Sequence, residues 1–256
     1  ELMLAHVLKV TRFDLYLQFD RPLISSELEV LRGMVRRRAT REPLQYILGE
    51  AHFYRRTFTV NPAVLIPRPE TELLVEEVLR RTQSIRCLDI GTGSGCIGIT
   101  IALERPETEV VAIDASKEAL EVTVMNGEAL GAKNIQFQEV DFFDDAGMRS
   151  LGTFDLIVSN PPYVPVAEMP HLQPEVRDYE PRLALTDDGD GYRFYRRFLD
   201  VAPYLLRSPG TVFFELGFGH APTVRQLFTS AGYEVDVLTD LDRVERFLYA
   251  TTERLR

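Results

Sequence analysis

The stretch that decides the fold is Cys87–Cys96, with the sequence CLDIGTGSGC. A short apolar run leads into a turn with three glycines, and a mostly apolar segment follows over Ile97–Leu103. A strand, a glycine-rich turn and a helix in this order open a nucleotide-binding βαβ unit. A second apolar run, Val110–Ile113, ends in Asp114. A carboxylate at the tip of the second strand can accept hydrogen bonds from both hydroxyls of a ribose, so the pattern predicts a nucleotide-type ligand rather than a plain βα turn.

The spacing of the glycines distinguishes between nucleotide ligands. A dinucleotide loop of the form Gly-x-Gly-x-x-Gly would need a glycine where this chain has Cys96. Asp89 also stands two residues before Gly91, and a carboxylate beside the loop would repel a diphosphate. S-adenosylmethionine, which has an ammonium, a ribose and an adenine but no pyrophosphate, fits better. We expect this cofactor to be bound by the loop and its two acids, namely Asp89, Gly91, Thr92, Gly93, Ser94, Gly95 and Asp114.

A second motif, Asn160-Pro161-Pro162-Tyr163, ends the apolar run Phe154–Ser159. The Asn160 amide offers one acceptor and two donors in a plane, neither proline has an N–H, and an aromatic ring can cover a flat substrate face. A simple turn is the alternative, because Asn and Pro are common turn residues. We expect the four residues to hold an –NH2 nucleophile, with Asn160 also close to the cofactor.

The two motifs are expected to meet in space. In an open doubly wound sheet, ligands bind beyond the carboxyl ends of the strands, at the point where the strand order reverses. The glycine loop follows the first strand of the unit and the Asn160 motif follows the fourth, and these strands are neighbours in the order 3-2-1-4-5. A cofactor beside an amide slot is the layout of a group-transfer enzyme.

Apolar periodicity predicts the elements around these motifs. Strands are expected at 86–90, 109–113, 135–139, 154–159, 211–215, 234–238 and 246–251, and the last two should pair antiparallel because no helix separates them. Helices are expected to begin near Glu70, Gly95 and Lys117, and to cover 191–206 and 221–231. The long loop 164–190, which follows the Asn160 motif, is typical of a lid or a substrate groove.

The chain resembles the HemK/PrmC-type protein-(glutamine-N5) methyltransferases over nearly its whole length. Besides the Asn160 motif, the resemblance rests on Arg41–Gly49 (REPLQYILG), Leu65–Glu72 (LIPRPETE) and Asp178–Gly191 (DYEPRLALTDDGDG). One departure is visible: the family tends to have Asp-x-x-Gly-x-x-Arg where this chain has Asp240–Arg246, DLDRVER. The resemblance covers three separate signatures, so it is far more specific than the Asn-Pro-Pro-Tyr motif alone.

The resemblance implies a fold and an activity. The fold is α/β, a class I S-adenosylmethionine-dependent methyltransferase with a Rossmann-like, seven-stranded and mostly parallel sheet. The sequence pattern itself divides the chain: helical spacing without catalytic residues predicts a substrate-docking domain at 1–45, alternation predicts a hairpin connector at 46–66, and βα alternation predicts the methyltransferase domain at 67–256. The reaction is methylation of the glutamine in the Gly-Gly-Gln motif of class 1 peptide-chain release factors, with S-adenosylhomocysteine as the second product.

Roles of single residues also follow from the resemblance. The Asn160 side-chain oxygen and the Pro161 carbonyl would accept hydrogen bonds from the substrate –NH2, which makes these two the expected catalytic residues. Asp141 and Phe142 would border the adenine, the first by a hydrogen bond and the second by contact with the ring. Three alternatives stay open: a ribosomal-protein glutamine methyltransferase, an adenine-N6 nucleic-acid methyltransferase, and a nucleotide-binding module without catalysis, which would leave the Asn160 motif without a role.

Composition limits the partners. The net charge of −10 argues against duplex DNA as the main substrate, because neutralisation of phosphates supplies most non-specific affinity. The four histidines are scattered and suggest no metal site, and no apolar run approaches the ~20 residues that span a bilayer. The two cysteines are expected to be small core residues in a reducing compartment. We therefore expect a cytoplasmic monomer that acts on a protein and binds neither metal nor membrane.

Overall fold

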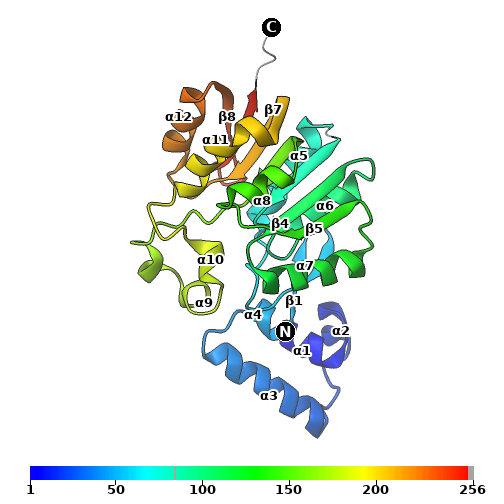
Figure 1. Ribbon diagram of the computed structural model, residues 1–256. Helices are drawn as coiled ribbons and strands as arrows, with labels where there is room; N and C mark the ends of the chain where they lie inside the picture. The colour runs from blue at the N-terminus through cyan, green and yellow to red at the C-terminus, as the bar shows by residue number, and fades with distance from the viewer. Residues whose placement is uncertain (84, 253–256) are drawn as a thin grey trace.

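The computed structural model describes residues 1–83 and 85–252, which form an α/β body and an N-terminal helical unit (Figure 1). Within 85–252, the body contains a seven-stranded sheet with the order β5-β4-β3-β6-β7-β9-β8. Its strands are β3 (Arg86–Ile90), β4 (Glu109–Asp114), β5 (Ile135–Glu139), β6 (Phe154–Ser159), β7 (Leu206–Glu215), β8 (Tyr233–Thr239) and β9 (Glu245–Thr252). β9 is antiparallel to β7 and β8, whereas the other neighbouring strands are parallel. The predicted strand order and the reversed last strand are thus confirmed.

The sheet is covered by helices on both faces, which is why its central strands consist of nearly continuous apolar residues. The helices of the body are α5 (Pro69–Arg81), α6 (Cys96–Glu104), α7 (Lys117–Leu130), α8 (Asp145–Ser150), α11 (Arg193–Leu205) and α12 (Ala221–Ser230). Leu74 of α5 and Ile99 of α6 belong to one buried cluster. Phe198 of α11 and Phe228 of α12 belong to the other, where their rings stack 5.6 Å apart. The sequence analysis missed α8.

The N-terminal unit is helical, as predicted, and a hairpin connects it to the body (Figure 1). Its helices are α1 (Leu2–Leu8), α2 (Arg12–Leu17), α3 (Ser25–Ala39) and α4 (Leu44–Leu48), and the hairpin strands are β1 (Glu50–Phe53) and β2 (Arg56–Thr59). The expected domain boundary between residues 45 and 46 falls inside α4. The division of the chain into domains at this position stays a prediction.

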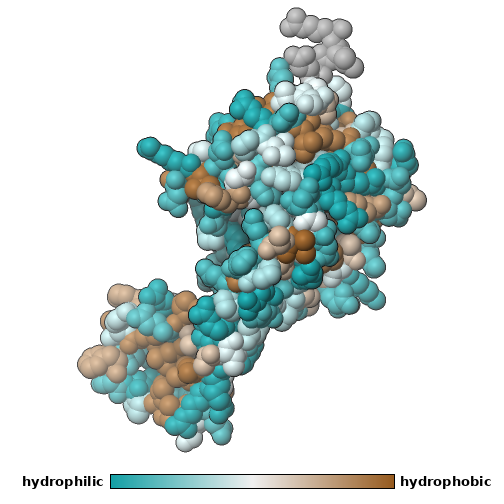
Figure 2. All heavy atoms as spheres, turned by 90° about the vertical axis from the view of Figure 1, so that its left-hand side faces the viewer, coloured by the Kyte–Doolittle hydropathy of each residue, from teal (hydrophilic) through white to brown (hydrophobic). Residues whose placement is uncertain are grey.

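The helical unit has little core of its own. Among residues 1–42, Ala5 is the buried one. Phe13, Leu17 and Phe19 are 70%, 65% and 86% exposed. Figure 2 shows the unit as a lobe beside the body, with apolar side chains spread over its surface.

The expected long loop at 164–190 is largely folded. It contains a 3-10 turn, η1 (Met169–His171), and two short helices, α9 (Pro174–Arg177) and α10 (Arg182–Leu185). Side chains join it to the end of α3 and the residues that follow: Glu175 pairs with Arg38 and Arg41 at 3.0 and 2.7 Å, and the Tyr179 hydroxyl donates to the carbonyl of Thr40. This segment therefore lies between the helical unit and the body rather than hanging free.

The turn between β8 and β9 contains the departure at Asp240–Arg246. The Asp240 carboxylate accepts from the backbone N–H groups of Asp242 and Val244 and from the Arg246 guanidinium. Arg243, which stands where the family tends to have glycine, adopts a φ of 62°. The turn keeps the glycine-type conformation with a side chain that is unfavourable there.

Candidate active site

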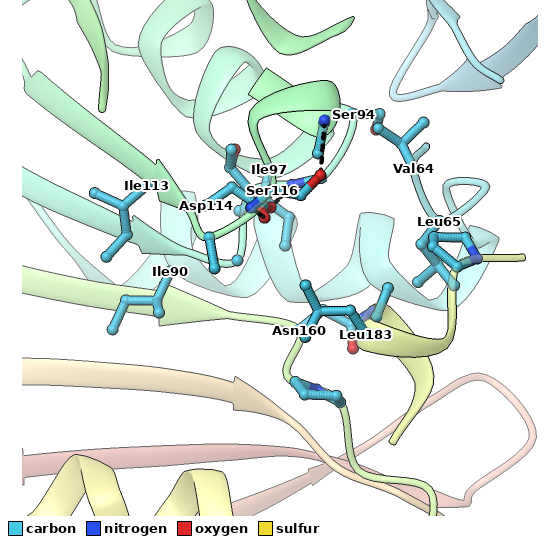
Figure 3. Close-up of a pocket in the computed structure, with 18 of the residues that line it drawn as sticks. Val64, Leu65, Ile90, Ser94, Ile97, Ile113, Asp114, Ser116, Asn160 and Leu183 are labelled. Atoms are coloured by element: carbon cyan, nitrogen blue, oxygen red, sulfur yellow. Dashed lines mark hydrogen bonds between the residues drawn. The ribbon is translucent and has the colours of Figure 1, made fainter. Parts of the chain in front are cut away.

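A cavity opens at the carboxyl ends of β3, β4 and β6, where the strand order reverses (Figure 3). The glycine loop and Asp114 form one wall, and Asn160 lies across from them beside Leu183. Val64 and Leu65, from the segment before α5, close a further side. The structure thus brings together the two motifs that the sequence places on separate strands.

Most backbone donors of the glycine loop are already used within the protein. The N–H groups of Gly91 and Thr92 both donate to the carbonyl of Ile113, and that of Gly95 donates to Thr92. The N–H of Gly93 donates to the Asp114 carboxylate at 2.9 Å. Few amides of the loop remain for a diphosphate, which agrees with a ligand that lacks one.

Asp114 ends β4 and lines the cavity. Its Oδ2 accepts from Gly93 and its Oδ1 accepts from the N–H of Ser116, both at 2.9 Å. Each carboxylate oxygen keeps a free lone pair for a further donor. Burial raises the pKa of Asp114, and its hydrogen bonds to Ser116 and Gly93 oppose that shift. Two neighbouring acceptors held in this way match the two adjacent hydroxyls of a ribose.

Asp89 and Gly95 do not line the cavity, in contrast to the other predicted residues of the loop. The Asp89 side chain is fully buried, and its Oδ2 accepts from the Thr92 hydroxyl at 2.7 Å and from the N–H of Gly98 at 2.9 Å. Burial raises the pKa of Asp89 to about 7. Through these hydrogen bonds Asp89 links the loop to α6. Its surroundings do not favour the direct cofactor contact that we expected from its sequence position.

Gly95 is required by packing. It adopts a φ of +82°, and a Cβ there would lie 2.5 Å from Ile99 Cδ1. The Ser94 hydroxyl, in contrast, is buried without a hydrogen-bond partner among the described residues, and Ser94 lines the cavity. Of these two neighbours, Ser94 is the one with a group available to a ligand.

The residues expected near the adenine are brought together with apolar neighbours. Phe142 is 6% exposed, lines the cavity and stacks on Phe194 at 4.4 Å between ring centroids. The exposed Asp141 also lines the cavity, and its Oδ1 accepts from the N–H of Phe143 at 2.8 Å. Ile90 and Ile113, which line the cavity (Figure 3), belong to the same buried cluster as Phe142. A flat aromatic ring would find apolar contact and one carboxylate acceptor here.

The Asn160 motif divides between the cavity and the interior. Asn160 and Pro162 line the cavity, whereas Pro161 is buried and Tyr163 does not reach the wall. The Asn160 amide donates to the Thr71 hydroxyl at 3.3 Å. The Tyr163 hydroxyl donates to Glu215 at 3.2 Å. This contact turns the Tyr163 ring inward. The role that we expected for this ring, covering a flat face of the substrate, stays a prediction.

The similarity to known proteins is extensive. Residues 69–175 match the methyltransferase small domain family, and residues 1–49 match the PrmC N-terminal domain. The release factor glutamine methyltransferase of Geobacter sulfurreducens is 47% identical over 91% of this chain and 81% of its own length. That of Chlorobaculum tepidum is 46% identical over 97% of this chain and 87% of its own. The chain belongs to the release factor glutamine methyltransferase family. It is a methyltransferase, and its cofactor is S-adenosylmethionine.

Solved structures of other proteins are similar to this chain in fold. A methyltransferase from Pyrococcus furiosus has a TM-score of 0.55 and 19% identity, and the match covers 77% of this chain and 88% of that one. A ribosomal protein L11 methylase from Lactobacillus delbrueckii has a TM-score of 0.52 and 20% identity, covering 76% and 84%. At these identities the likeness shows the class I methyltransferase fold alone, which confirms the predicted fold class.

The cavity fits the cofactor of the release factor glutamine methyltransferase family. Asp114 offers acceptors to the ribose, Phe142 offers an apolar surface to the adenine, and the free Ser94 hydroxyl is one polar group for the remainder. Among the residues that the structure describes, no group of three or more His, Cys, Asp or Glu side chains is arranged to hold a metal ion. In the same part of the chain, no helix is both long and apolar enough to cross a membrane.

Two residues of the site were missed by the sequence analysis. Thr71 lines the cavity and Glu215 is buried behind it, and their side chains are 2.6 Å apart. Thr71 lies within the segment Leu65–Glu72 that the family resemblance singled out, so a signal existed for it. Glu215 is an acid at the end of the apolar run Val212–Phe214, and an acid in such a place is unusual unless it has a partner.

A further buried residue, Asn126 of α7, links the connector to the glycine loop. Its amide oxygen accepts from the N–H of Thr59 at 2.7 Å, and its amide nitrogen donates to the carbonyls of Thr59 and Ser94 at 3.0 and 2.9 Å. Three hydrogen bonds thus join β2, α7 and the loop that borders the cofactor cavity.

Proposed function

We propose that this enzyme transfers a methyl group from S-adenosylmethionine to the side-chain nitrogen of the glutamine in the Gly-Gly-Gln motif of class 1 peptide-chain release factors. The observation that carries the proposal is the position of the Asn160 amide at the end of β6, which lines the same cavity as Asp114 at the end of β4, with β3 between the two strands. Membership of the release factor glutamine methyltransferase family supports the choice of substrate.

The reaction requires alignment rather than strong acid or base groups. S-adenosylmethionine supplies, when bound, a methyl group on a sulfonium that is already a good leaving group. The substrate amide nitrogen is a weak nucleophile because its lone pair is delocalised into the carbonyl. Asn160 Oδ1 and the Pro161 carbonyl accept from the substrate –NH2, which orients the nitrogen for in-line attack and stabilises the positive charge that develops on it. After transfer, the extra proton leaves to water.

The N-terminal helical unit is proposed to dock the release factor. None of the predicted site residues lies in residues 1–45, whereas the exposed rings of Phe13 and Phe19 offer apolar contact area. The net charge of −10 suits a basic, RNA-binding protein as partner. In this proposal residues 46–66 form the connector, residues 67–256 perform the chemistry, and the enzyme acts as a monomer in the cytoplasm, where translation ends.

The test is methyl transfer from isotopically labelled cofactor to an intact release factor. We expect label on the glutamine of the Gly-Gly-Gln motif, located by mass spectrometry of the digested product. A release factor with Asn in place of this glutamine serves as the matched control and should stay unlabelled. Label on a ribosomal protein or on adenine in nucleic acid, with none on the release factor, would contradict the proposal and identify the alternative substrate.

A further inference from the structure

A buried carboxylate, Glu215, joins both ends of the Asn160 motif from behind the cavity. It is 3% exposed and lies at the end of β7. Its Oε2 accepts from the Thr71 hydroxyl at 2.6 Å, and its Oε1 accepts from the Tyr163 hydroxyl at 3.2 Å. Thr71 is also the residue that accepts from the Asn160 amide at 3.3 Å. Glu215 therefore contacts Tyr163 directly and Asn160 through Thr71.

The directions of these hydrogen bonds decide which half of the Asn160 amide faces Thr71. A threonine hydroxyl has one proton and two lone pairs. Because the proton of Thr71 is donated to Glu215, only lone pairs remain for Asn160. Only the –NH2 half of an amide can bind to a lone pair, so the carbonyl half of Asn160 is turned away from Thr71. Asn160 lines the cavity, and its free acceptor is thus available there.

We propose that Glu215 and Thr71 are positioning residues, which fix the Asn160 amide so that its oxygen, and not its –NH2, is presented to the substrate nitrogen. The inference rests on the proposed function, because an acceptor at this point is useful only when the nucleophile carries hydrogen. Neither residue exchanges a proton with the substrate. Their effect is to prevent rotation of the amide by half a turn, which would place two donors against the donors of the substrate.

The charge of Glu215 sets the direction of the whole chain of hydrogen bonds. A carboxylate accepts from Thr71, whereas a Glu215 that is protonated on Oε2, the oxygen bound to Thr71, has a proton to donate there. Thr71 would then accept from Glu215 and donate to Asn160, which must turn its oxygen toward Thr71 and its –NH2 toward the cavity. Burial raises the pKa of Glu215 to about 7. The carboxylate predominates above this pH and the acid below it, so turnover should fall as the pH decreases through neutrality.

We assign this titration to Glu215 itself rather than to the titratable groups around it. Arg246 of β9 favours the carboxylate, and Glu70 of α5 disfavours it. Burial raises the pKa of the Cys96 thiol of α6 to about 12, and it also raises the pKa values of the Tyr163 and Tyr195 phenols. His220, whose ring lies 6.3 Å from that of Tyr163, has its pKa lowered by burial. The cysteine and tyrosines thus stay neutral around neutral pH.

The experiment compares Thr71→Val, Thr71→Ser, Glu215→Gln and a matched control. Thr82→Val makes the first substitution at the other end of α5, where the hydroxyl donates to the carbonyl of Val78 away from the cavity. Methylation of an intact release factor is measured on both sides of pH 7 with saturating cofactor, so that titration of Asp89 beneath the glycine loop does not limit the rate.

The inference predicts a separation of kcat from KM. Thr71→Val should lower kcat about 100-fold, the loss typical of a preorganised polar contact, with little change in KM for the release factor or in cofactor affinity. Thr71→Ser retains the hydroxyl and should restore kcat to within a few-fold of wild type. Glu215→Gln removes the group that titrates, so its kcat should no longer fall on the acid side. Thr82→Val should match the wild type.

Several results would overturn the inference. A Thr71→Val enzyme that binds cofactor normally and keeps the wild-type kcat would do so. A Glu215→Gln enzyme that keeps the acid-side fall would also do so, and this variant has nearly the shape of the original residue, so it remains informative if Thr71→Val does not fold. Failure of the proposed function is distinguishable, because the wild type itself would leave the release factor unlabelled. The same variants are then compared on the substrate that accepts the methyl group.

Discussion

The α/β body buries phenylalanine side chains that the N-terminal helical unit exposes. Phe213 and Phe214 of β7 have no exposed surface, whereas Phe13 and Phe19 of the helical unit are 70% and 86% exposed. A buried phenylalanine contributes about 1.5–3 kcal/mol to stability, and an exposed one contributes little. The difference teaches that the body holds the cavity in a rigid core, while the apolar residues of the helical unit are not explained by its own folding.

The contact of the helical unit with the 164–190 segment is polar, whereas α4 and the hairpin pack on α7 through a buried apolar cluster that includes Tyr46, Ala51 and Val122. Glu175 of α9 pairs with Arg38 of α3 and with Arg41, which follows α3, and the two arginine side chains are 38% and 56% exposed. Ion pairs of this exposure are each worth about 0–1 kcal/mol. The helical unit is thus held against the 164–190 segment by contacts far weaker than those within the sheet.

The largest effect is expected from Asn160→Ala, which changes the chemistry of the body. It should lower kcat by about 10²–10³, because a preorganised polar contact to the reacting group is lost, and should spare cofactor affinity. Single-turnover methyl transfer with saturating cofactor measures this. Asn160→Asp should be comparably slow, because it replaces the donor that binds Thr71 with an oxygen. Wild-type rates in both variants would remove Asn160 from the mechanism.

Asp114→Ala tests the other wall of the cavity. It should weaken the binding of S-adenosylmethionine by about 1.5–3 kcal/mol, the range for hydrogen bonds to a charged group, which corresponds to roughly 10- to 150-fold in Kd. Calorimetric titration of the two proteins measures the difference, with circular dichroism as the check on folding. Equal affinities would mean that the ribose is held by other residues.

A smaller effect, and one confined to the partner, is expected from Phe13→Ser combined with Phe19→Ser. Loss of two exposed rings should raise KM for the release factor by about tenfold, the effect of about 1.4 kcal/mol of lost contact. kcat and cofactor affinity should stay unchanged, because the cavity lies in the body. Leu241→Ser, at a residue 89% exposed in the turn between β8 and β9, is the matched control. An unchanged KM in the double variant would break the proposed division of labour.

The smallest effect is expected from Arg243→Gly, a change in the body but away from the cavity. Glycine relieves the positive φ of 62° and should stabilise the protein by about 0.5–1 kcal/mol, or a rise in Tm of about 1–4 °C for a chain of this size. Thermal unfolding followed by circular dichroism measures it, and kcat should not change. A lower Tm would mean that the arginine side chain stabilises the turn more than its backbone conformation costs.

The sequence predicted the parts of the fold that depend on local patterns. The strand Phe154–Ser159 has the predicted bounds, because a continuous apolar run between turn residues has few other uses in an α/β protein. In the segment 164–190, expected to be a loop, the sequence analysis missed α9 and α10, since these helices have four residues each and show no periodicity. Helices of one turn are set by tertiary contacts, which a local pattern does not contain.

The sequence predicted the site residues that reach the cavity directly from the end of a strand. It did not predict the residues that act through a contact with another side chain. Asp114 ends its strand and reaches the cavity, as the ribose-binding pattern predicts. Asp89 looks equivalent in sequence but is buried beneath the loop, because its strand points that side chain to α6. The pair of Thr71 and Glu215 is separated by 144 residues, and no local pattern reports a contact formed by folding over such a distance.

Asn126 contacts both the hairpin connector and the cofactor loop of the body. Its amide bonds the connector strand β2 at Thr59 and the cofactor loop at Ser94. A displacement of the hairpin therefore strains the same side chain that supports the loop. Because coupling free energies are reciprocal, a docked protein that tightened cofactor binding by displacing or fixing the hairpin would itself be bound more tightly, by the same factor, when the cofactor is present.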